Sequence, residues 1–336
     1  MKKRNLFVSV AYGCLILVLV LVIIYSGLQL LESTVFLKPQ IDVTEPPSKT
    51  ITENEIAYFP RQDITVVLVC GIDRTGPMVS SDAYNNPGDV DMINLVIFDE
   101  KEKELNVLSL NRDTMTEVPV LGIGGREAYT TYEQLALSYS YGSGMEDSCE
   151  NTVKAVSHLL NGIYIDHYIT LNMDAIQILN DAVGGVTVNV TDDFSQVDPT
   201  LTPGVHTLHG EQAVHFVRNR KDVGNQLNLS RMERHKAYMQ GFLEAMKSAT
   251  EKSATFALDT YSKVSKYMIT DCSSTVFSNM LERYKDYPLG KIISPEGENK
   301  IGPDRYGEDH YQFYLDEESM KQIILDLFYA PKDMDN

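Results

Sequence analysis

Apolar runs separated by polar turns dominate the chain after residue 60. Residues 64–69, Ile-Thr-Val-Val-Leu-Val, are rich in β-branched side chains, as is typical of a buried strand. A polar loop follows at 73–89. The apolar runs at 92–98 and 105–110 flank the charged turn 99–103, and this arrangement predicts a pair of neighbouring strands.

Helical spacing of apolar residues appears further along the chain. It predicts helices at 148–161 and 173–182, and two glycines end the second helix before a strand at 186–190. Two more helices are expected at 230–247 and 317–328. This alternation predicts an α/β fold, with a mixed central β-sheet and helices on both of its faces.

The N-terminus has the pattern of a membrane anchor. Lys2, Lys3 and Arg4 precede a charge-free run from Leu6 to Leu31. About 20 apolar residues span a bilayer, and the basic residues favour a cytoplasmic N-terminus. A cleaved signal peptide is the alternative, but its apolar region is normally shorter. We expect one transmembrane helix in the cell membrane, with the rest of the chain outside the cell.

This topology divides the chain into four parts. Residues 1–31 form the cytoplasmic tail and transmembrane anchor, and residues 32–62, with four prolines and little periodicity, form an extracellular stalk. Residues 63–250 form the domain that carries the candidate chemistry. Residues 251–336 form a C-terminal extension that packs on this domain.

Composition narrows the range of functions. The chain has 336 residues and a formal net charge of −18, so the phosphate backbone of nucleic acid would repel it. Its cysteines are Cys14, Cys70, Cys149 and Cys272, and no CxxC pair suggests a zinc knuckle. Cys14 and Cys70 lie in apolar runs and are expected in the core, whereas Cys149 and Cys272 could pair outside the cell.

One basic stretch stands out against this acidic background. It begins at Arg218 and Arg220, which follow the run 213–217. If that run is extended, its period of two places both side chains on one face, where arginine forks suit phosphate oxygens. Surface ion pairs are the alternative for these two residues.

The same stretch continues into a predicted helix start. Ser230 and Glu233 fit a capping box, with serine at the N-cap. Arg231 would then lie in the first turn, where a helix N-terminus favours anions. An ion pair with an acidic neighbour is the alternative for Arg231.

Carboxylates and another arginine follow the predicted strands. Asp73 follows the first strand, and Asp91 opens the next. Side chains at adjacent strand ends can share Mg²⁺, which takes oxygen ligands from one or two carboxylates and from phosphate. Strand-end aspartates more often cap turns. Arg112 and Asp113 follow the third strand, either as an ion pair or as a phosphate contact.

Taken in order, these segments resemble the LytR-CpsA-Psr family, whose members attach teichoic acids and capsular polysaccharides to peptidoglycan. The resemblance covers roughly residues 64–247, and the order and spacing of its short segments make it specific. The matching segments are 67–73, 91–95, 109–113, 139–142, 181–188, 208–213, 217–220 and 231–234.

The resemblance implies a role for each matching residue. The expected Mg²⁺ ligands are Asp73 and Asp91. The expected catalytic residues are Arg112, Arg218, Arg220 and Asp91, and the four arginines Arg112, Arg218, Arg220 and Arg231 would grip a pyrophosphate. The expected substrate-binding residues are Arg74, Asp113, Gln134, Arg231 and His235. Gln134 and His235 stand where the family usually has Lys and Gln.

The resemblance further implies a Mg²⁺-dependent phosphotransferase that moves a glycopolymer from a polyprenyl pyrophosphate carrier to peptidoglycan. Phosphoryl transfer depends mainly on positioning of the reacting groups and on neutralisation of the phosphate charge. The lipid bilayer is a further expected partner, and nucleic acid is not. Two alternatives stay open. One is an extracellular lipid-pyrophosphate pyrophosphatase or phosphodiesterase that uses water as its acceptor, and the other is a non-catalytic wall-binding membrane regulator.

Overall fold

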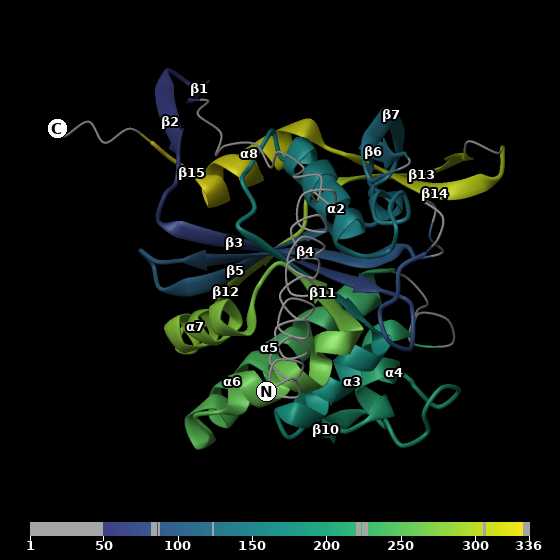
Figure 1. Ribbon diagram of the computed structural model, residues 1–336, viewed down its shortest axis with the longest axis vertical. Coiled ribbons are helices and arrows are strands. Elements are labelled where there is room, and N and C mark those ends of the chain that lie inside the picture. The colour runs from purple at the N-terminus through teal and green to yellow at the C-terminus, as the bar shows by residue number, and fades with distance from the viewer. Residues whose placement is uncertain are drawn as a thin grey trace, which may run out of the picture. The chain divides into compact units, whose positions relative to one another are not determined.

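A central six-stranded sheet positions the candidate site. The computed structural model describes residues 50–81, 86, 88–122, 124–219, 223, 228–304 and 307–331, apart from the side chains of 228–230 and 232. The strand order is β11-β8-β3-β4-β5-β12 (Figure 1). These strands are β3 (Ile64–Ile72), β4 (Val90–Asp99), β5 (Glu104–Leu110), β8 (His167–Asn172), β11 (Met268–Thr270) and β12 (Leu289–Ile293). β3 pairs in parallel with β8, and β5 with β12, whereas the other neighbours are antiparallel. The expected mixed sheet is therefore confirmed.

Helices cover both faces of this sheet, as the sequence predicts. One face carries α2 (Glu146–Leu159) and α8 (Glu317–Phe328) (Figure 1). The other carries α3 (Met173–Ala182), α4 (Glu211–Arg218), α5 (Asn228–Lys252), α6 (Phe256–Val264) and α7 (Ser274–Tyr284). The described residues also form two short 3₁₀ helices, η1 (Leu135–Ser138) and η2 (Ser265–Tyr267).

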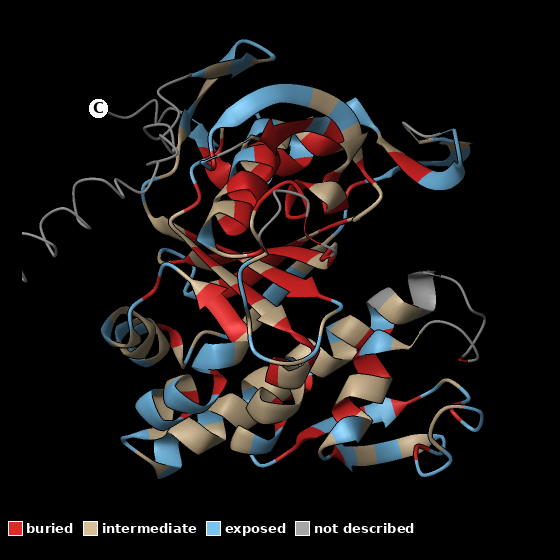
Figure 2. Ribbon diagram, turned by 45° about the vertical axis from the view of Figure 1, so that its right-hand side comes forward, coloured by how far each residue is buried: buried red, intermediate tan, exposed pale blue. Residues whose placement is uncertain are grey.

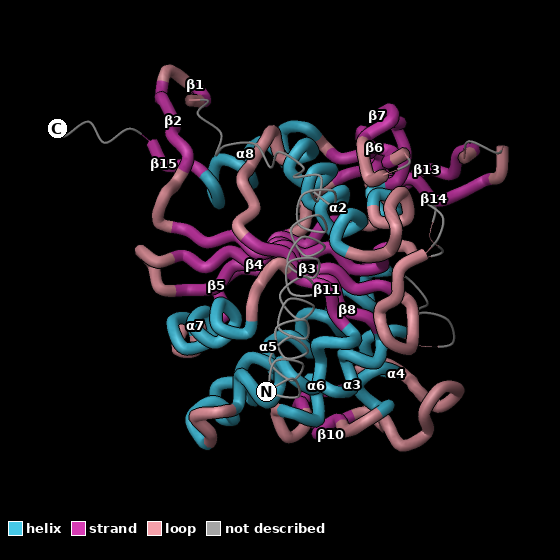
Figure 3. The backbone as a smooth tube through the Cα atoms, in the orientation of Figure 1, coloured by secondary structure: helices cyan, strands magenta, loops and turns pink. Residues whose placement is uncertain are grey.

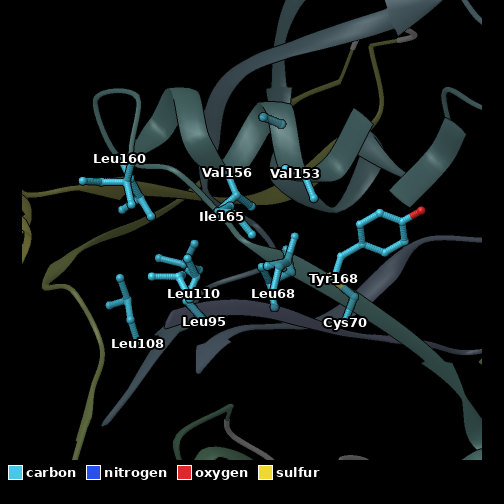
Figure 4. Close-up of a cluster of buried hydrophobic side chains, with 14 of the residues drawn as sticks. Leu68, Cys70, Leu95, Leu108, Leu110, Val153, Val156, Leu160, Ile165 and Tyr168 are labelled. Carbon is cyan, nitrogen blue, oxygen red and sulfur yellow. The ribbon is translucent and has the colours of Figure 1, made fainter. Parts of the chain in front are cut away.

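The larger core lies between the sheet and the α2–α8 face. Leu68 and Cys70 of β3 point to this face because side chains alternate along a strand. Figure 4 shows them below Val153 and Val156 of α2. Buried residues accordingly concentrate in the central strands and in α2 (Figure 2).

A second core supports the end of the molecule that carries α4. It joins the antiparallel pair β9 (Val186–Val190) and β10 (Gly204–Leu208) to α4 and α5. Phe194 and Phe216 stack in this core with ring centroids 5.8 Å apart. Because α4 is packed by this core, the side chains at its C-terminal end have a fixed position.

Two hairpins lie beyond one end of the central sheet. β6 (Met115–Leu121) pairs with β7 (Glu127–Gln134), and β13 (Gly297–Pro303) pairs with β14 (Asp309–Leu315). Figure 3 shows these hairpins side by side, and a bridge between Thr114 and Phe313 joins them.

The structure changes two of the expected boundaries. β11 and β12 come after residue 250 and yet are strands of the central sheet, so that residue does not separate two structural units. Within the expected stalk, β1 (Ile51–Glu53) and β2 (Ile56–Pro60) form a hairpin that pairs with β15 (Tyr329–Pro331). The sequence did not predict these strands because they are short and are completed by a partner from the far end of the chain.

The N-terminal expectations fall on residues that the structure does not describe. The proposed anchor, Cys14 and residues 32–49 of the stalk all lie outside the described part. Within that part, none of the helices combines the length and the apolar character needed to cross a membrane.

The segment before Arg218 is helical, so the extended conformation that was considered for it does not occur. Residues 211–218 form α4. Ala213, Phe216 and Val217 are buried at helical spacing in the second core, and this packing outweighs the β propensity of the run. The predicted capping box is wrong, because α5 begins at Asn228, before Ser230.

Side chains of α5 satisfy the last carbonyl groups of α4. Arg234 Nε donates to Phe216 O at 2.9 Å, and His235 Nε2 lies 2.8 Å from Val217 O. A neutral His235 ring with its proton on Nε2 donates in this contact. Helix-terminal carbonyls have no partner within their own helix. These two contacts therefore fix the end of α4, which carries Arg218.

The three described cysteines are all buried and free. The possible pairing of Cys149 with Cys272 therefore does not occur. Cys70 lies in the core, as expected, and Cys149 Sγ donates to Thr170 Oγ1 at 3.3 Å.

A buried ion pair at the start of β3 generates a stability prediction. Arg61 donates to both oxygens of Asp99, at 2.7 and 2.8 Å, and the Asp99 side chain is only 5% exposed. Arg61→Met would leave this carboxylate buried without its guanidinium, so the free energy of unfolding should fall by about 3–5 kcal/mol in urea titrations. Lys247→Met, which breaks an exposed pair with Asp286, should change it little. Equal effects of the two substitutions would contradict this role of Arg61.

The buried His235 ring generates a second prediction. Burial lowers the pKa of His235 from 6.5 to about 4, and the charges of Arg231 and Arg234 act in the same direction. Between these two pH values the unfolded chain binds a proton at His235 that the folded chain does not, so the free energy of unfolding falls as the pH falls. His235→Gln keeps an N–H donor for Val217 O and should lose less stability between about pH 7 and about pH 4.5. Identical losses in variant and wild type, measured by urea unfolding, would rule out this role.

Candidate active site

The central sheet brings an aspartate and an arginine to the same end of two neighbouring strands. In the antiparallel β4–β5 pair, Ile93 lies opposite Leu110. Arg112 lies in the turn two residues beyond Leu110, and Asp91 is the second residue of β4, so both come to the same end of the sheet. The Arg112 guanidinium forms an ion pair with the Asp91 carboxylate. Strand pairing thus brings the two residues to one end of the sheet, and the turn after β5 completes the contact.

Two more carboxylates lie around the same guanidinium. Asp89 Oδ2 is 3.6 Å from Arg112 NH2, and Asp113 Oδ1 is 3.4 Å from Arg112 Nε. Asp89 stands two residues before Asp91, immediately before β4 begins. The sequence signal for Asp89 is its place directly before that strand.

A second arginine comes from the helix α4. Arg218 NH2 lies 2.8 Å from Asp73 Oδ1, and Asp73 directly follows β3. Because β3 and β4 are antiparallel, with Ile72 opposite Val90, Asp73 lies at the same end of the sheet as Asp91. Both side chains of this pair are about half exposed, and they are accessible to a ligand.

One cleft of about 1010 Å³ gathers these groups. Among the described residues, the guanidiniums that line it are those of Arg112, Arg218 and Arg231, which come from three separate segments. The structure therefore brings together the three described arginines that were expected to converge. Arg220 lies outside the described residues. The catalytic and binding roles of all four arginines stay predictions.

Carboxylates outnumber guanidiniums in this cleft. The acidic lining residues of the described part are Asp73, Asp89, Asp91, Asp113, Glu133 and Asp304. Ion pairing with these groups offsets the repulsion among the arginines. The described lining is therefore net negative, and it cannot attract a phosphate group through fixed charge alone.

The two hairpins form a wall of the cleft. Gln134, at the end of β7, lines the cleft, and its Nε2 donates to Asp113 Oδ1 at 3.1 Å and to Tyr311 O at 2.6 Å. Tyr132 of β7 and His310 of β14 line the same cleft. Sequence reasoning missed Tyr132, Asp304, His310 and Tyr311. The β14 residues had no local signal, since only the fold brings that strand to the site.

Two of the expected substrate-binding residues lie outside the lining of the cleft. The Arg74 side chain contacts the loop at Gly88, where an added Cβ would be 3.2 Å from Arg74 Cδ. The His235 ring is held by Val217 O, behind the end of α4. These positions suit residues that support the site, while Asp113, Gln134 and Arg231 face the cleft itself.

The strand-end aspartates provide the oxygen donors that Mg²⁺ prefers. Asp73, Asp89 and Asp91 all line the cleft, so this donor set fits the expected metal. A tighter group of possible ligands, within 4.8 Å of one another, consists of His167, Asp271 and Cys272. His167 opens β8, at the end of that strand away from the cleft.

Comparison with known proteins finds relatives that match most of the chain. An Enterococcus faecalis protein named polyisoprenyl-teichoic acid–peptidoglycan teichoic acid transferase TagU is 28% identical over 294 residues, which is 87% of each chain. The Bacillus subtilis protein of the same name is 25% identical over 287 residues, 85% of this chain and 82% of that one. The crystal structure of protein gbs0355 from Streptococcus agalactiae superimposes with a TM-score of 0.63 at 25% identity, covering 79% of this chain and 86% of that one.

The family assignment rests on most of the chain. The sequence profile of the LytR_cpsA_psr family matches residues 34–326, well beyond the 64–247 of the resemblance and through the β13–β14 hairpin. The cleft, its strand-end aspartates and its arginines all fall within this match. The chain belongs to the LytR-CpsA-Psr family.

Proposed function

We propose that this chain is a Mg²⁺-dependent phosphotransferase that moves a glycopolymer from a polyprenyl pyrophosphate carrier to peptidoglycan, on the outer face of the membrane that anchors it. The proposal rests on one observation: Arg112, Arg218 and Arg231 line the same cleft as the strand-end aspartates. Family membership and two relatives named as teichoic acid transferases support the same chemistry.

The charge balance of the cleft supports the metal requirement. The described lining holds six carboxylates and three guanidiniums, so a pyrophosphate would enter a site that is already net negative. A divalent cation bound between carboxylates and phosphate oxygens removes this repulsion. Asp73, Asp89 and Asp91 are the residues that would hold it. When bound, the metal would neutralise charge on the pyrophosphate oxygens during transfer.

The arginines would act by positioning. Arg112 and Arg218 are already held by carboxylates, so their forks are oriented before a substrate binds. A pyrophosphate would exchange these carboxylate contacts for phosphate contacts. The acceptor hydroxyl would then attack the polymer-side phosphorus, and the bond to the lipid phosphate would break, with polyprenyl monophosphate leaving. Asp113 is the candidate general base for the hydroxyl proton, because Asp91 is a proposed metal ligand.

Replacing Arg218 tests the proposal. Arg218→Ala removes a charged donor and leaves Asp73 without its partner, so affinity for a polyprenyl pyrophosphate should fall about ten- to a hundredfold. Arg218→Lys should restore only part of it, because an ammonium group cannot form the bidentate fork. Binding is measured by titration of a short-chain lipid pyrophosphate, and transfer by the radiolabelled polymer found on purified peptidoglycan, with and without EDTA.

Arg283→Ala is the matched control. Arg283 also pairs with a carboxylate, Glu100, but it lies outside the cleft, so both binding and transfer should be unchanged. Transfer that continues in EDTA would contradict the metal requirement. Release of free polymer at the same rate with and without peptidoglycan would identify a pyrophosphatase instead. Lipid binding without turnover under all conditions would identify a non-catalytic regulator.

A further inference from the structure

The β13–β14 hairpin is fastened directly beside Arg112. Phe313 N donates to Asp113 O at 2.8 Å, and Thr114 and Phe313 form a parallel bridge. The parallel direction brings Tyr311, two residues before Phe313, toward Arg112, two residues before Thr114. The hydrogen bond from Gln134 to Tyr311 O fixes this approach. A strand from the C-terminal part of the chain thus forms a wall of the cleft next to the proposed phosphate site.

Two tyrosine rings on this side of the cleft are left largely open to solvent. Tyr311 of β14 is 62% exposed and Tyr132 of β7 is 57% exposed, and both line the cleft. A large aromatic side chain normally stabilises a fold by being buried, so exposed rings inside a cleft indicate a ligand surface. Flat apolar rings with a polar edge suit ligands that are themselves partly apolar and partly polar, and sugar rings are such ligands.

Polar side chains accompany the rings. His310 and Asp304 both line the cleft, and His310 Nε2 lies 3.2 Å from Asp304 Oδ2, which orients the imidazole. Glu133 lies beside Tyr132 on β7. These groups offer both donors and acceptors to hydroxyl and amide groups of a ligand.

Charge divides the cleft into two sides. Its described arginines come from the end of β5, from α4 and from α5, whereas the described lining of the two hairpins contains carboxylates and no lysine or arginine. A phosphate-rich polymer would be repelled by Asp304 and Glu133, and an uncharged sugar ring would not. The hairpin side therefore fits the acceptor better than it fits the anionic donor.

We infer that the β6–β7 and β13–β14 hairpins form the acceptor subsite, which binds N-acetylhexosamine rings of a glycan strand by stacking on Tyr132 and Tyr311. His310, oriented by Asp304, hydrogen-bonds the same sugar. This inference rests on the proposed function for the identity of the acceptor. It extends that function by assigning the two substrates to adjoining parts of one cleft.

The double substitution Tyr132→Ala with Tyr311→Ala tests the inference. Loss of both rings should weaken binding of an N-acetylglucosamine tetrasaccharide about tenfold, as followed by NMR titration of the intact protein. The KM for a soluble glycan acceptor should rise by a similar factor, with affinity for the lipid pyrophosphate unchanged. Tyr311→Phe keeps the ring and should bind the tetrasaccharide almost as the wild type does. Thermal unfolding of each variant checks that the hairpins remain folded.

Tyr129→Ala provides the matched control. Tyr129 is also on β7 and is 57% exposed, but it is not among the lining residues of the cleft, so its loss should leave sugar binding unchanged. Wild-type tetrasaccharide affinity in the double variant, or an equal loss in Tyr129→Ala, would overturn the inference. A loss of lipid pyrophosphate affinity with sugar binding intact would also overturn it, because the rings would then hold the donor. If donor binding survives Arg218→Ala while the tyrosine results hold, the proposed function fails and the sugar subsite stands.

Discussion

An anion-binding cleft must hold several positive charges close together before any anion arrives, and in this protein carboxylates make that possible. Arg112 lies among Asp89, Asp91 and Asp113, and Arg218 lies against Asp73. The antiparallel pairing of β3, β4 and β5 brings these strand ends to one side of the sheet, and the C-terminal end of α4 adds Arg218. The arginine side chains are therefore oriented before a ligand binds, and the described lining of the cleft carries more negative than positive charge. We propose that phosphate binding in this cleft exchanges these ion pairs and adds a cation.

Other elements hold the paired arginines and the wall of the cleft in place. The contacts from Arg234 and His235 hold the C-terminal end of α4, and hence Arg218, against α5. On the opposite side, Gln134 bonds to both Asp113 and the backbone of Tyr311, so it connects the proposed phosphate site to the hairpin wall. Gln134 is a neutral side chain, and both of its hydrogen bonds are structural contacts. The hairpin side is consequently poorer in positive charge, which favours an uncharged ligand there.

The sequence predicted the parts of the site that depend on local patterns. Asp73, Asp91 and Arg112 were found because they follow or open strands with clear apolar runs, and α3 and α8 match their predicted ranges. The conformation before Arg218 was left open, because a Val-His-Phe-Val run is compatible with a strand, and only burial in the second core makes it a helix. Tyr311 and His310 could not be found from local patterns, since β14 reaches the cleft only through a bridge to Thr114, far away in the sequence.

The central claim is that the paired arginines exchange their carboxylates for pyrophosphate, and a structure of the complex tests it most directly. The measurement is a crystal structure with a short-chain polyprenyl pyrophosphate and Mg²⁺. Nitrogens of Arg112 and Arg218 should lie about 2.7–3.2 Å from phosphate oxygens, with the metal held by the strand-end aspartates. The contact between Arg218 and Asp73 should then be longer than the 2.8 Å of the free protein. A pyrophosphate bound elsewhere, with both arginines still paired to their carboxylates, would contradict the claim.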